Sequence, residues 1–498
     1  MIAAETRPDM SSARSSGGSS GRIWGVARFE LRRLQRSLLL LLGLLLLVSG
    51  LALYSGGLHQ GHQATNARLI TERERDFLAK QEKKITKRIA DLQAGGKALS
   101  PDRKIYRNPA FLAQHGAAAI QTNGPLLQIS VGLTPLQPQS TQVTLADPAL
   151  LEAQENLQHP LQLWTGHFDL AFVLVYLLPL LLIVLSFDLT AGEQASGNLK
   201  MLLVQGGGLQ ALILGKLLAR ALVLAGMLAL LTLLAWGSSA WMQQPFAWTR
   251  WNLMLLSTLC YGGIWLGLAA WLNALRWNPA NIAAALASLW LLGVWVIPGA
   301  GQQLVQSLSP VPTRISYIQS YREASEQVRQ TSSRLLGKYM EDHPELSGGA
   351  DNHYAMLQLA KEQALAKAIR PVVETYNARL QRQQQIARWL QYLSPVSVFE
   401  TSLMQLAGSG AERQQDYRAQ VTTFHADWHS YFLPLIQRNQ ALGPEHLAQL
   451  PQFRYRELGL RALAGALIPQ ILFLGLLAAG LLGLSLQRYR HYEVIDAE

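Results

Sequence analysis

Long apolar blocks separate polar stretches along the chain, and each block has the length of a membrane helix. A helix needs roughly 20 apolar residues to cross the hydrocarbon core of a bilayer. Helical structure also satisfies the backbone N–H and C=O groups, for which lipid offers no partners. The blocks predict an α-helical integral membrane protein with six transmembrane helices, at residues 37–54, 168–186, 216–236, 252–272, 280–298 and 462–486.

The first block, 37–54, has two interpretations. It is nearly pure leucine and follows several arginines, as does the apolar region of a secretory signal peptide. However, about 36 residues precede it and the apolar run is long for such a region. We therefore interpret it as a retained span.

Basic residues close to the span ends predict the orientation, because cytoplasmic flanks carry an excess of Lys and Arg. A cluster of arginines before the first span places the amino terminus in the cytoplasm. Six crossings then return the carboxyl-terminal tail, 487–498, to the same side, and the basic residues there agree with this: Lys200, Lys216, Arg220, Arg276, Arg488 and Arg490.

The residues before the first span fall into two parts. Residues 1–21 are rich in Ser and Gly, which is typical of disorder. Residues 22–36 alternate apolar and basic positions at helical spacing, which predicts a helix lying on the inner membrane surface. A simple positively charged flank accounts for the arginines equally well.

Two long segments, 55–166 and 299–461, are expected outside the cytoplasm. The first has helical periodicity over 64–92, and its short runs 126–133 and 141–145 predict strands. The second reads as mostly helical, with a helix over 411–438 and a helical stripe over 365–390 that Pro371 should kink or break near its start. We expect the two segments to pack together as one extracytoplasmic domain, mainly helical with a small β part.

Composition supports the membrane class and excludes others. Hydrophobic residues make up 49% of the chain and charged residues 15%. The net charge is +11, but the basic residues form no aromatic-interleaved patch, so we expect no nucleic-acid partner. The single cysteine, Cys260, permits no disulfide within the chain, which suits a bacterial inner-membrane protein.

Catalytic signatures are largely missing. The pair Gly215-Lys216 lacks the rest of a phosphate-binding loop, because Gln210 stands where a glycine is needed and Leu217 follows the lysine. We therefore expect no catalytic residues and no cofactor bound by this chain. Few charged groups lie inside the spans, which argues against transport coupled to ions or protons.

His425 and His429 are weak metal-site candidates. They stand four residues apart, so a helix would put both on one face, near Asp427. Ala426 occupies the position where a zinc-protease helix carries Glu. We favour solvated or packed histidines and expect no metal.

The segment 187–215 is the most informative part of the cytoplasmic side. It reads as a short amphipathic helix, a glycine turn and a helix that enters the membrane, and on physical grounds an ordinary interfacial loop fits equally well. The segment begins with Asp188, and its informative positions are Glu193, Gly197, Leu199, Lys200, Leu202, Leu203, Gly215 and Lys216. From Glu193 onward these residues resemble the coupling-helix region of ABC-2-type permeases, which has an acidic residue, then Gly-Thr-Leu-Lys/Arg, a Leu pair, a Pro-containing turn and Gly-Lys. Asn198 stands in place of the Thr, and Gly206–Gly208 in place of the Pro turn.

A second informative region contains Leu393-Ser394-Pro395-Val396-Ser397-Val398-Phe399 and Leu406-Ala407-Gly408. These residues are similar to the DUF3526 subgroup of the same permeases, which usually has Gly-Thr-Asp where this chain has Gly408-Ser409-Gly410. The relatives of this subgroup include permeases linked to copper-enzyme maturation.

The resemblance implies the permease subunit of an ABC exporter. A separate cytoplasmic ATPase, which binds ATP and Mg²⁺, would dock near 188–203, and a second permease, identical or related, would complete the membrane unit. Leucine-rich spans favour a lipid-like cargo or no cargo at all, and a periplasmic partner is then expected. The alternative is a membrane-anchored scaffold or mechanotransmission protein; an integral-membrane enzyme has less support, because no His, Asp or Ser cluster lies near a span end.

Overall fold

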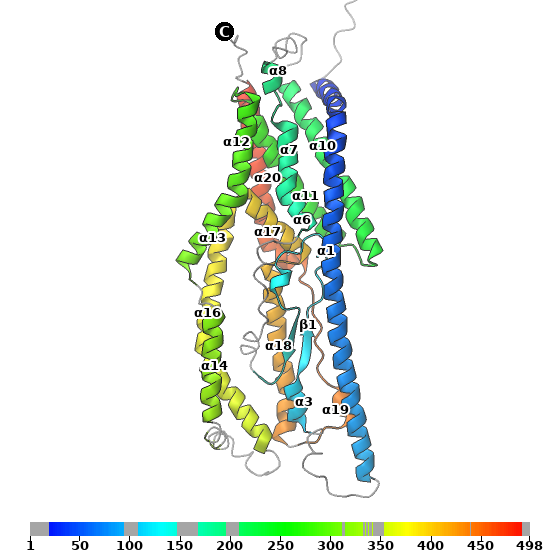
Figure 1. Cartoon of the computed structure of the whole chain (residues 1–498), viewed down its shortest axis with the longest axis vertical. Coiled ribbons are helices and arrows are strands. Elements are labelled where there is room, and N and C mark those ends of the chain that lie inside the picture. The colour runs from blue at the N-terminus through cyan, green and yellow to red at the C-terminus, as the bar shows by residue number, and fades with distance from the viewer. Residues whose placement is uncertain are drawn as a thin grey trace, which may run out of the picture.

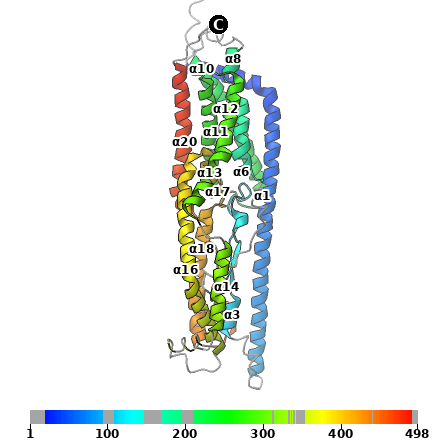
Figure 2. The ribbon, with the colours of Figure 1, turned by 60° about the vertical axis from the view of Figure 1, so that its left-hand side comes forward.

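A computed structural model describes residues 19–93, 108–146, 168–195, 209–310, 314–331, 353–438 and 440–490, with the isolated positions 334, 337 and 341. The molecule is elongated, with a bundle of long helices at one end and a second domain at the other (Figure 1). The start of the first helix and the end of the last lie at the same end of the molecule, as Figures 1 and 2 both show.

Six helices of the described chain are long and apolar enough to cross a membrane. The protein is thus a multi-pass membrane protein, as expected. The six are α1 (Ser19–Gln93), α6–η4–α7 (Leu170–Phe172, Val173–Leu177 and Leu178–Ser186), α10 (Leu209–Trp241), α11 (Trp248–Asn273), α12–η5–α13 (Pro279–Leu291, Leu292–Val296 and Ile297–Leu308) and α20 (Leu460–Arg490).

Helix α11 lies at the centre of the bundle. A Cβ atom on Gly267 would lie 2.9 Å from the Cβ atom of Leu481 on α20, so the two backbones approach more closely than larger residues allow. On the bundle surface, large apolar side chains stay exposed, such as Leu40 at 79% and Trp295 at 72%. Such a surface is suited to lipid.

The first helix differs from the expected arrangement. We expected separate elements over 22–36, 37–54 and 64–92, but α1 is one continuous helix of 75 residues. At 1.5 Å per residue it is roughly 110 Å long, several times the thickness of a bilayer core. It is continuous because no proline interrupts the sequence between Ser19 and Gln93. One rigid element therefore joins both ends of the molecule.

The end remote from the start of α1 and the end of α20 holds a second core, which we call the distal domain. It contains the end of α1, α3 (Pro109–His115), β1 (Ala117–Ile120), β2 (Ser140–Val143), α18 (Ala411–Gln437) and α19 (Pro444–Ala448). Ile85 of α1 and Tyr417 of α18 are buried in the same cluster, and the Tyr417 hydroxyl donates to the Ala119 carbonyl at 2.7 Å. Parts of the two long segments thus pack against each other in this core.

The expected strand over 126–133 is wrong. These residues form turns, in which Ile129 N–H donates to the Leu126 carbonyl at 2.9 Å and Leu126 N–H to the Ala407 carbonyl at 3.2 Å. Leu126, Leu127 and Ile129 are fully buried, so their apolar character reflects burial on all sides rather than a strand. The strand that pairs with β2 is β1, which the sequence Ala-Ala-Ala-Ile does not signal because alanine is uncommon in strands.

The remaining helices form an arm beside α18 (Figure 1). Helix α14 (Arg314–Gln330) packs along α16 (His353–Leu390), with Ile369 and Val373 buried between them. Helix α16 starts well before Pro371 and continues through it, so Pro371 neither lies near the start of the helix nor breaks it. The expected helix over 411–438 is confirmed by α18.

Helix α17 (Pro395–Ala407) joins the distal domain to the bundle. The Ser394 hydroxyl accepts a hydrogen bond from Ser397 N–H, which caps the helix, and donates to the Gly293 carbonyl of η5 at 2.7 Å. Phe399 stacks on Tyr261 of α11 with ring centroids 4.2 Å apart. Gly408 ends the helix at φ 75°, a conformation that favours glycine.

Glu362 on α16 makes the stability of the arm depend on pH. Its Oε2 atom is buried without a hydrogen-bond partner in the described chain, and burial raises the pKa of this carboxyl from 4.5 to about 7. Between these values the folded state binds more protons than the unfolded state, so the free energy of unfolding falls as pH rises. We expect Glu362→Gln to remove this slope and to add on the order of 3 kcal/mol above pH 7.

The measurement is denaturant unfolding of the purified protein between pH 4.5 and 8. Glu326→Gln on the exposed surface of α14 is the matched control and should keep the slope. An unchanged slope in Glu362→Gln would contradict the assignment.

Candidate functional site

Two positive charges are buried in α10, close to the end of the bundle where the described chain starts and ends. Lys216 and Arg220 stand one helical turn apart, on the same face of the helix. Their side chains are 2% and 4% exposed. Charges buried to this extent in an apolar bundle require partners of opposite sign and hydrogen bonds.

The partners come from two other elements. Lys216 Nζ lies 2.6 Å from Glu193 Oε1 of α8 (Ala191–Ala195) and donates to the Leu189 carbonyl at 2.6 Å. It also lies 3.8 Å from Glu30 Oε1 of α1. Arg220 lies 3.3 Å from Glu30 Oε2 and donates to the Leu185 carbonyl at 2.9 Å. The two cations thus connect α1, α8 and α10.

Arg33 completes this arrangement on the surface. Its side chain is 55% exposed and lies 3.7 Å from Glu30 and 3.6 Å from Glu193. We call Glu30, Arg33, Glu193, Lys216 and Arg220 the charge cluster. Opposite charges alternate through it, so each buried carboxylate contacts more than one cation.

Asn273, at the end of α11, holds the turn between α7 and α8. Its Oδ1 atom accepts from the backbone N–H groups of Thr190 and Ala191 at 3.1 and 3.3 Å. Its Nδ2 atom donates to the carbonyls of Ser186 and Phe187, both at 3.3 Å. One buried side chain therefore satisfies groups at the end of one helix and the start of the next.

Two glycines allow the close approach of these elements. A Cβ atom on Gly215 would lie 2.6 Å from the Cβ atom of Val26, so α1 can contact α10 only because this position has no side chain. At Gly192 a Cβ atom would lie 2.3 Å from Asp188 Oδ1, which accepts from the Gly192 N–H at 2.5 Å. Asp188 thus caps the first turn of α8.

The structure brings together part of the predicted coupling set. Glu193, Gly215 and Lys216 meet at the charge cluster, and Asp188 lies beside it. Glu193 points inward to Lys216, so it positions α8. The other predicted residues lie outside the described residues: Gly197, Leu199, Lys200, Leu202 and Leu203.

Three members of the site were not predicted from the sequence: Glu30, Arg220 and Asn273. A usable signal exists for Arg220, because two cations one turn apart in an apolar helix require buried carboxylates. No local pattern indicates which carboxylate supplies the charge, since Glu30 is 190 residues away from Arg220 in the sequence. Asn273 carries no signal beyond its place at the end of an apolar block.

The two metal candidates share one face of α18, with ring centroids of His425 and His429 6.2 Å apart. The described part of the chain contains no group of three or more His, Cys, Asp or Glu side chains that could hold a metal ion.

Comparison with known families gives one match. Residues 314–456 match a family described as a domain of unknown function, DUF3526. The expected resemblance to DUF3526 is confirmed within this stretch, which contains α14, α16, α17 and α18. A search of curated proteins finds no match for the chain.

The quoted motif residues have structural roles in the matched stretch. Ser394 and Gly408 cap the two ends of α17, and Phe399 is buried against α11. Ser409 accepts a hydrogen bond from Leu133 N–H at 3.1 Å, and Gly410 precedes α18. The motif therefore builds the connection between bundle and distal domain, far from the charge cluster.

We expect the buried carboxylate of Glu30 to contribute more to the free energy of unfolding than the exposed charge of Arg33. Glu30→Leu leaves Arg220 buried without its carboxylate and should lower the free energy of unfolding by about 3–5 kcal/mol. Arg33→Gln removes a charge from the same cluster at an exposed position and should cost about 1 kcal/mol or less. Unfolding of both variants in mixed detergent micelles measures the difference, and equal losses would contradict the proposed role of burial.

Proposed function

We propose that this chain is the membrane-spanning permease subunit of an ABC-2-type transporter. A separate cytoplasmic ATPase, which binds ATP with Mg²⁺, drives it by docking near residues 188–203. The observation that carries the proposal is the 2.6 Å contact between Lys216 on α10 and Glu193 on α8, in the segment that resembles a coupling helix.

The contact is suited to transmitting force. A force on α8 acts on α10 through the Glu193–Lys216 ion pair. It acts on α1 through the contact of Lys216 with Glu30, because both of these groups are buried. The hydrogen bond from Thr190 N–H to Asn273 connects the same segment to α11. Buried ion pairs resist separation because each partner alone would be left desolvated. Displacement of α8 would therefore tilt several helices together.

The position of the segment also supports the proposal. Helix α8 lies at the end of the bundle where the described chain starts and ends (Figure 1). Basic residues gather at this end, which favours the cytoplasmic side of a bacterial inner membrane. The distal domain then lies outside the cytoplasm. A second permease, identical or related, completes the transporter, and the apolar spans favour export of a lipid-like cargo.

A second candidate is a mechanotransmission protein that acts on an envelope partner. It is favoured by ion pairs that connect the bundle to the distal domain. Glu457, just before α20, lies 2.8 Å from Arg413 of α18 and 3.8 Å from Arg250 of α11. Movement of α11 and α20 would thus reach the distal domain directly, with no cargo crossing the bundle.

The test combines partner recovery with ATP hydrolysis. The tagged chain is purified in mild detergent from its native host after cross-linking, and bound proteins are identified by mass spectrometry. We expect an ABC ATPase to be recovered. In nanodiscs containing both proteins, Glu193→Lys and Lys216→Glu should each lower the ATPase rate at least about tenfold, since each places like charges together.

The double variant Glu193→Lys/Lys216→Glu should restore part of the rate, because the pair is again of opposite sign. Glu326→Lys, on the exposed surface of α14, is the control and should leave the rate unchanged. Failure to recover an ATPase even after cross-linking would refute the permease assignment and leave the anchored scaffold. Recovery of the ATPase with no effect of either reversal would refute the role of the Lys216–Glu193 contact.

A further inference from the structure

An open cavity lies between the ends of α11 and α20, at the end of the bundle where the described chain starts and ends. Its volume is about 860 Å³, within the roughly 300–1,000 Å³ typical of ligand sites. Arg276 follows α11, and Arg488 and Arg490 stand in the last turn of α20. No acidic residue is among those that line the cavity. We call it the arginine cavity, and its charge attracts an anion.

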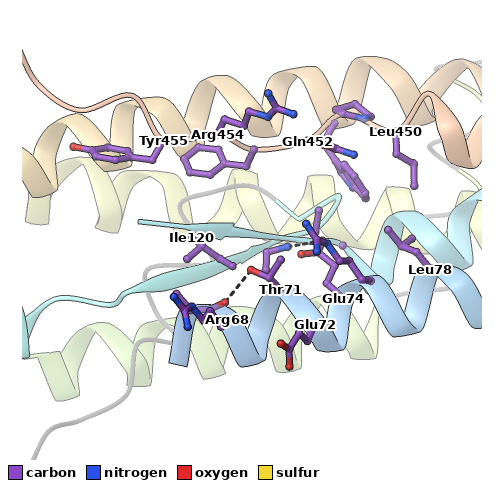
Figure 3. Close-up of a pocket in the computed structure, with 18 of the residues that line it drawn as sticks. Arg68, Thr71, Glu72, Glu74, Leu78, Ile120, Leu450, Gln452, Arg454 and Tyr455 are labelled. Atoms are coloured by element: carbon purple, nitrogen blue, oxygen red, sulfur yellow. Dashed lines mark hydrogen bonds between the residues drawn. The ribbon is translucent and has the colours of Figure 1, made fainter. Parts of the chain in front are cut away.

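The groove in the distal domain has a different character. It lies between α1 and the chain around Leu450 to Tyr455 (Figure 3), and its lining carries charges of both signs, among them Arg68, Glu72 and Glu74. Glu74 is also engaged with β1, since its Oε1 atom accepts from Ala118 N–H at 3.1 Å. This mixed charge favours neither an anion nor a cation, whereas the arginine cavity carries charge of one sign.

The arginine cavity lies at the level of the lipid headgroups. No charged residue stands between Arg461 and Arg488 of α20, nor between Arg250 of α11 and Arg276. At 1.5 Å per residue, either stretch is roughly 40 Å long, which is the thickness of a bilayer with its headgroup regions. Trp271 in the cavity wall agrees with this level, because tryptophan is enriched at membrane interfaces.

The cavity wall changes character along α20. Leu484, Gln487 and Arg488 share one face of the helix, in that order toward its end. Leu484 is 54% exposed, and four residues of helix place it about 6 Å along the axis from Arg488. Such a wall matches a phospholipid, whose acyl chain contacts the apolar part while its phosphate contacts the guanidinium groups.

Arg276 occupies a backbone conformation that disfavours arginine. Its φ angle is 61°, in the left-handed region where a helix usually ends in glycine or asparagine. Gln243 is the other non-glycine residue with positive φ in the described chain. Strain of this kind persists where the side chain has a use, and here the side chain places a guanidinium in the cavity wall.

We propose that the arginine cavity binds the phosphate of an anionic phospholipid, such as phosphatidylglycerol. Guanidinium groups bind phosphate oxygens through charge-assisted, bidentate hydrogen bonds. Arg488 and Arg490 form no ion pair with the described residues, so their N–H groups are open to a ligand. Basic pockets between membrane helices on the cytoplasmic side are suited to anionic headgroups. The inference rests on the six spans and not on the proposed transport function.

The first experiment is native mass spectrometry of the full-length protein, without an ATPase, in detergent that contains equal amounts of phosphatidylglycerol and phosphatidylcholine. We expect one phosphatidylglycerol to bind at least about tenfold more tightly than phosphatidylcholine. Arg488→Gln/Arg490→Gln should remove this preference. Arg28→Gln/Arg32→Gln, which removes two exposed charges of α1, should keep it within about twofold. Equal affinity for the two lipids, or the same loss in both variants, would overturn the proposal.

Arg276→Gly separates lipid binding from folding. Glycine adopts a φ angle of 61° without strain, so the midpoint of thermal unfolding in the absence of phosphatidylglycerol should not fall. The affinity for phosphatidylglycerol should nevertheless fall at least about fivefold, because one guanidinium group is lost. An unchanged affinity would contradict the assignment of Arg276 to the site.

A competition experiment distinguishes a lipid from a soluble phosphate compound. Inorganic phosphate at millimolar concentration should leave phosphatidylglycerol bound, because contact of an acyl chain with Leu484 adds to the affinity. Phosphatidylglycerol should also raise the midpoint of thermal unfolding of the wild type, since it binds the folded state. Displacement of the lipid by inorganic phosphate would overturn the lipid assignment in favour of a soluble phosphate compound.

Discussion

The burial of Lys216 and Arg220 is the constraint on which the membrane end of the structure depends. Two cations inside an apolar helix bundle are stable only with carboxylates at contact distance, and Glu30 and Glu193 supply them from two other elements. The chain therefore has to bring α1 and α8 against α10. Gly215 makes this approach sterically feasible. Electrostatics and close packing thus define a single arrangement of the three helices.

This arrangement has consequences at the other end of the molecule, because α1 is continuous. The helix that carries Glu30 in the charge cluster also carries Glu74 beside β1 and Ile85 in the distal core. A second connection runs through α17 and through Glu457, which contacts arginines of α11 and α18. The distal domain is therefore joined to the bundle by rigid helix on one side and by ion pairs on the other.

The sequence predicts the membrane helices well, because long apolar blocks have no other stable solution in lipid. Glu193, Gly215 and Lys216, singled out in the sequence, lie together at the charge cluster. Prediction fails where neighbours distant in the sequence decide the outcome. Residues 126–133 have a strand-like pattern but are surrounded on all sides, so turns replace the strand.

Long-range contacts explain the other failures. Local periodicity divides residues 19–93 into separate elements, because the sequence changes from apolar to polar along its length. The helix is nevertheless continuous, because no proline interrupts it. In the sequence, Glu30 is one acidic residue among the arginines before the first span. Only the fold places it between the buried cations Lys216 and Arg220. The role of Asn273 could not be predicted for the same reason, since its hydrogen-bond partners lie at the turn that follows α7.

The most direct test of the central claim is the distance between spin labels at Gln194 and Arg28, measured by pulsed electron paramagnetic resonance after replacement of Cys260. Both positions are exposed, one on α8 and one on α1. If the charge cluster makes these helices one unit, the distance distribution is narrow and stays unchanged when the ATPase partner binds ATP, while the distance from Gln194 to Ala280 changes. A Gln194–Arg28 distance that is broad, or that shifts with nucleotide, would contradict the account.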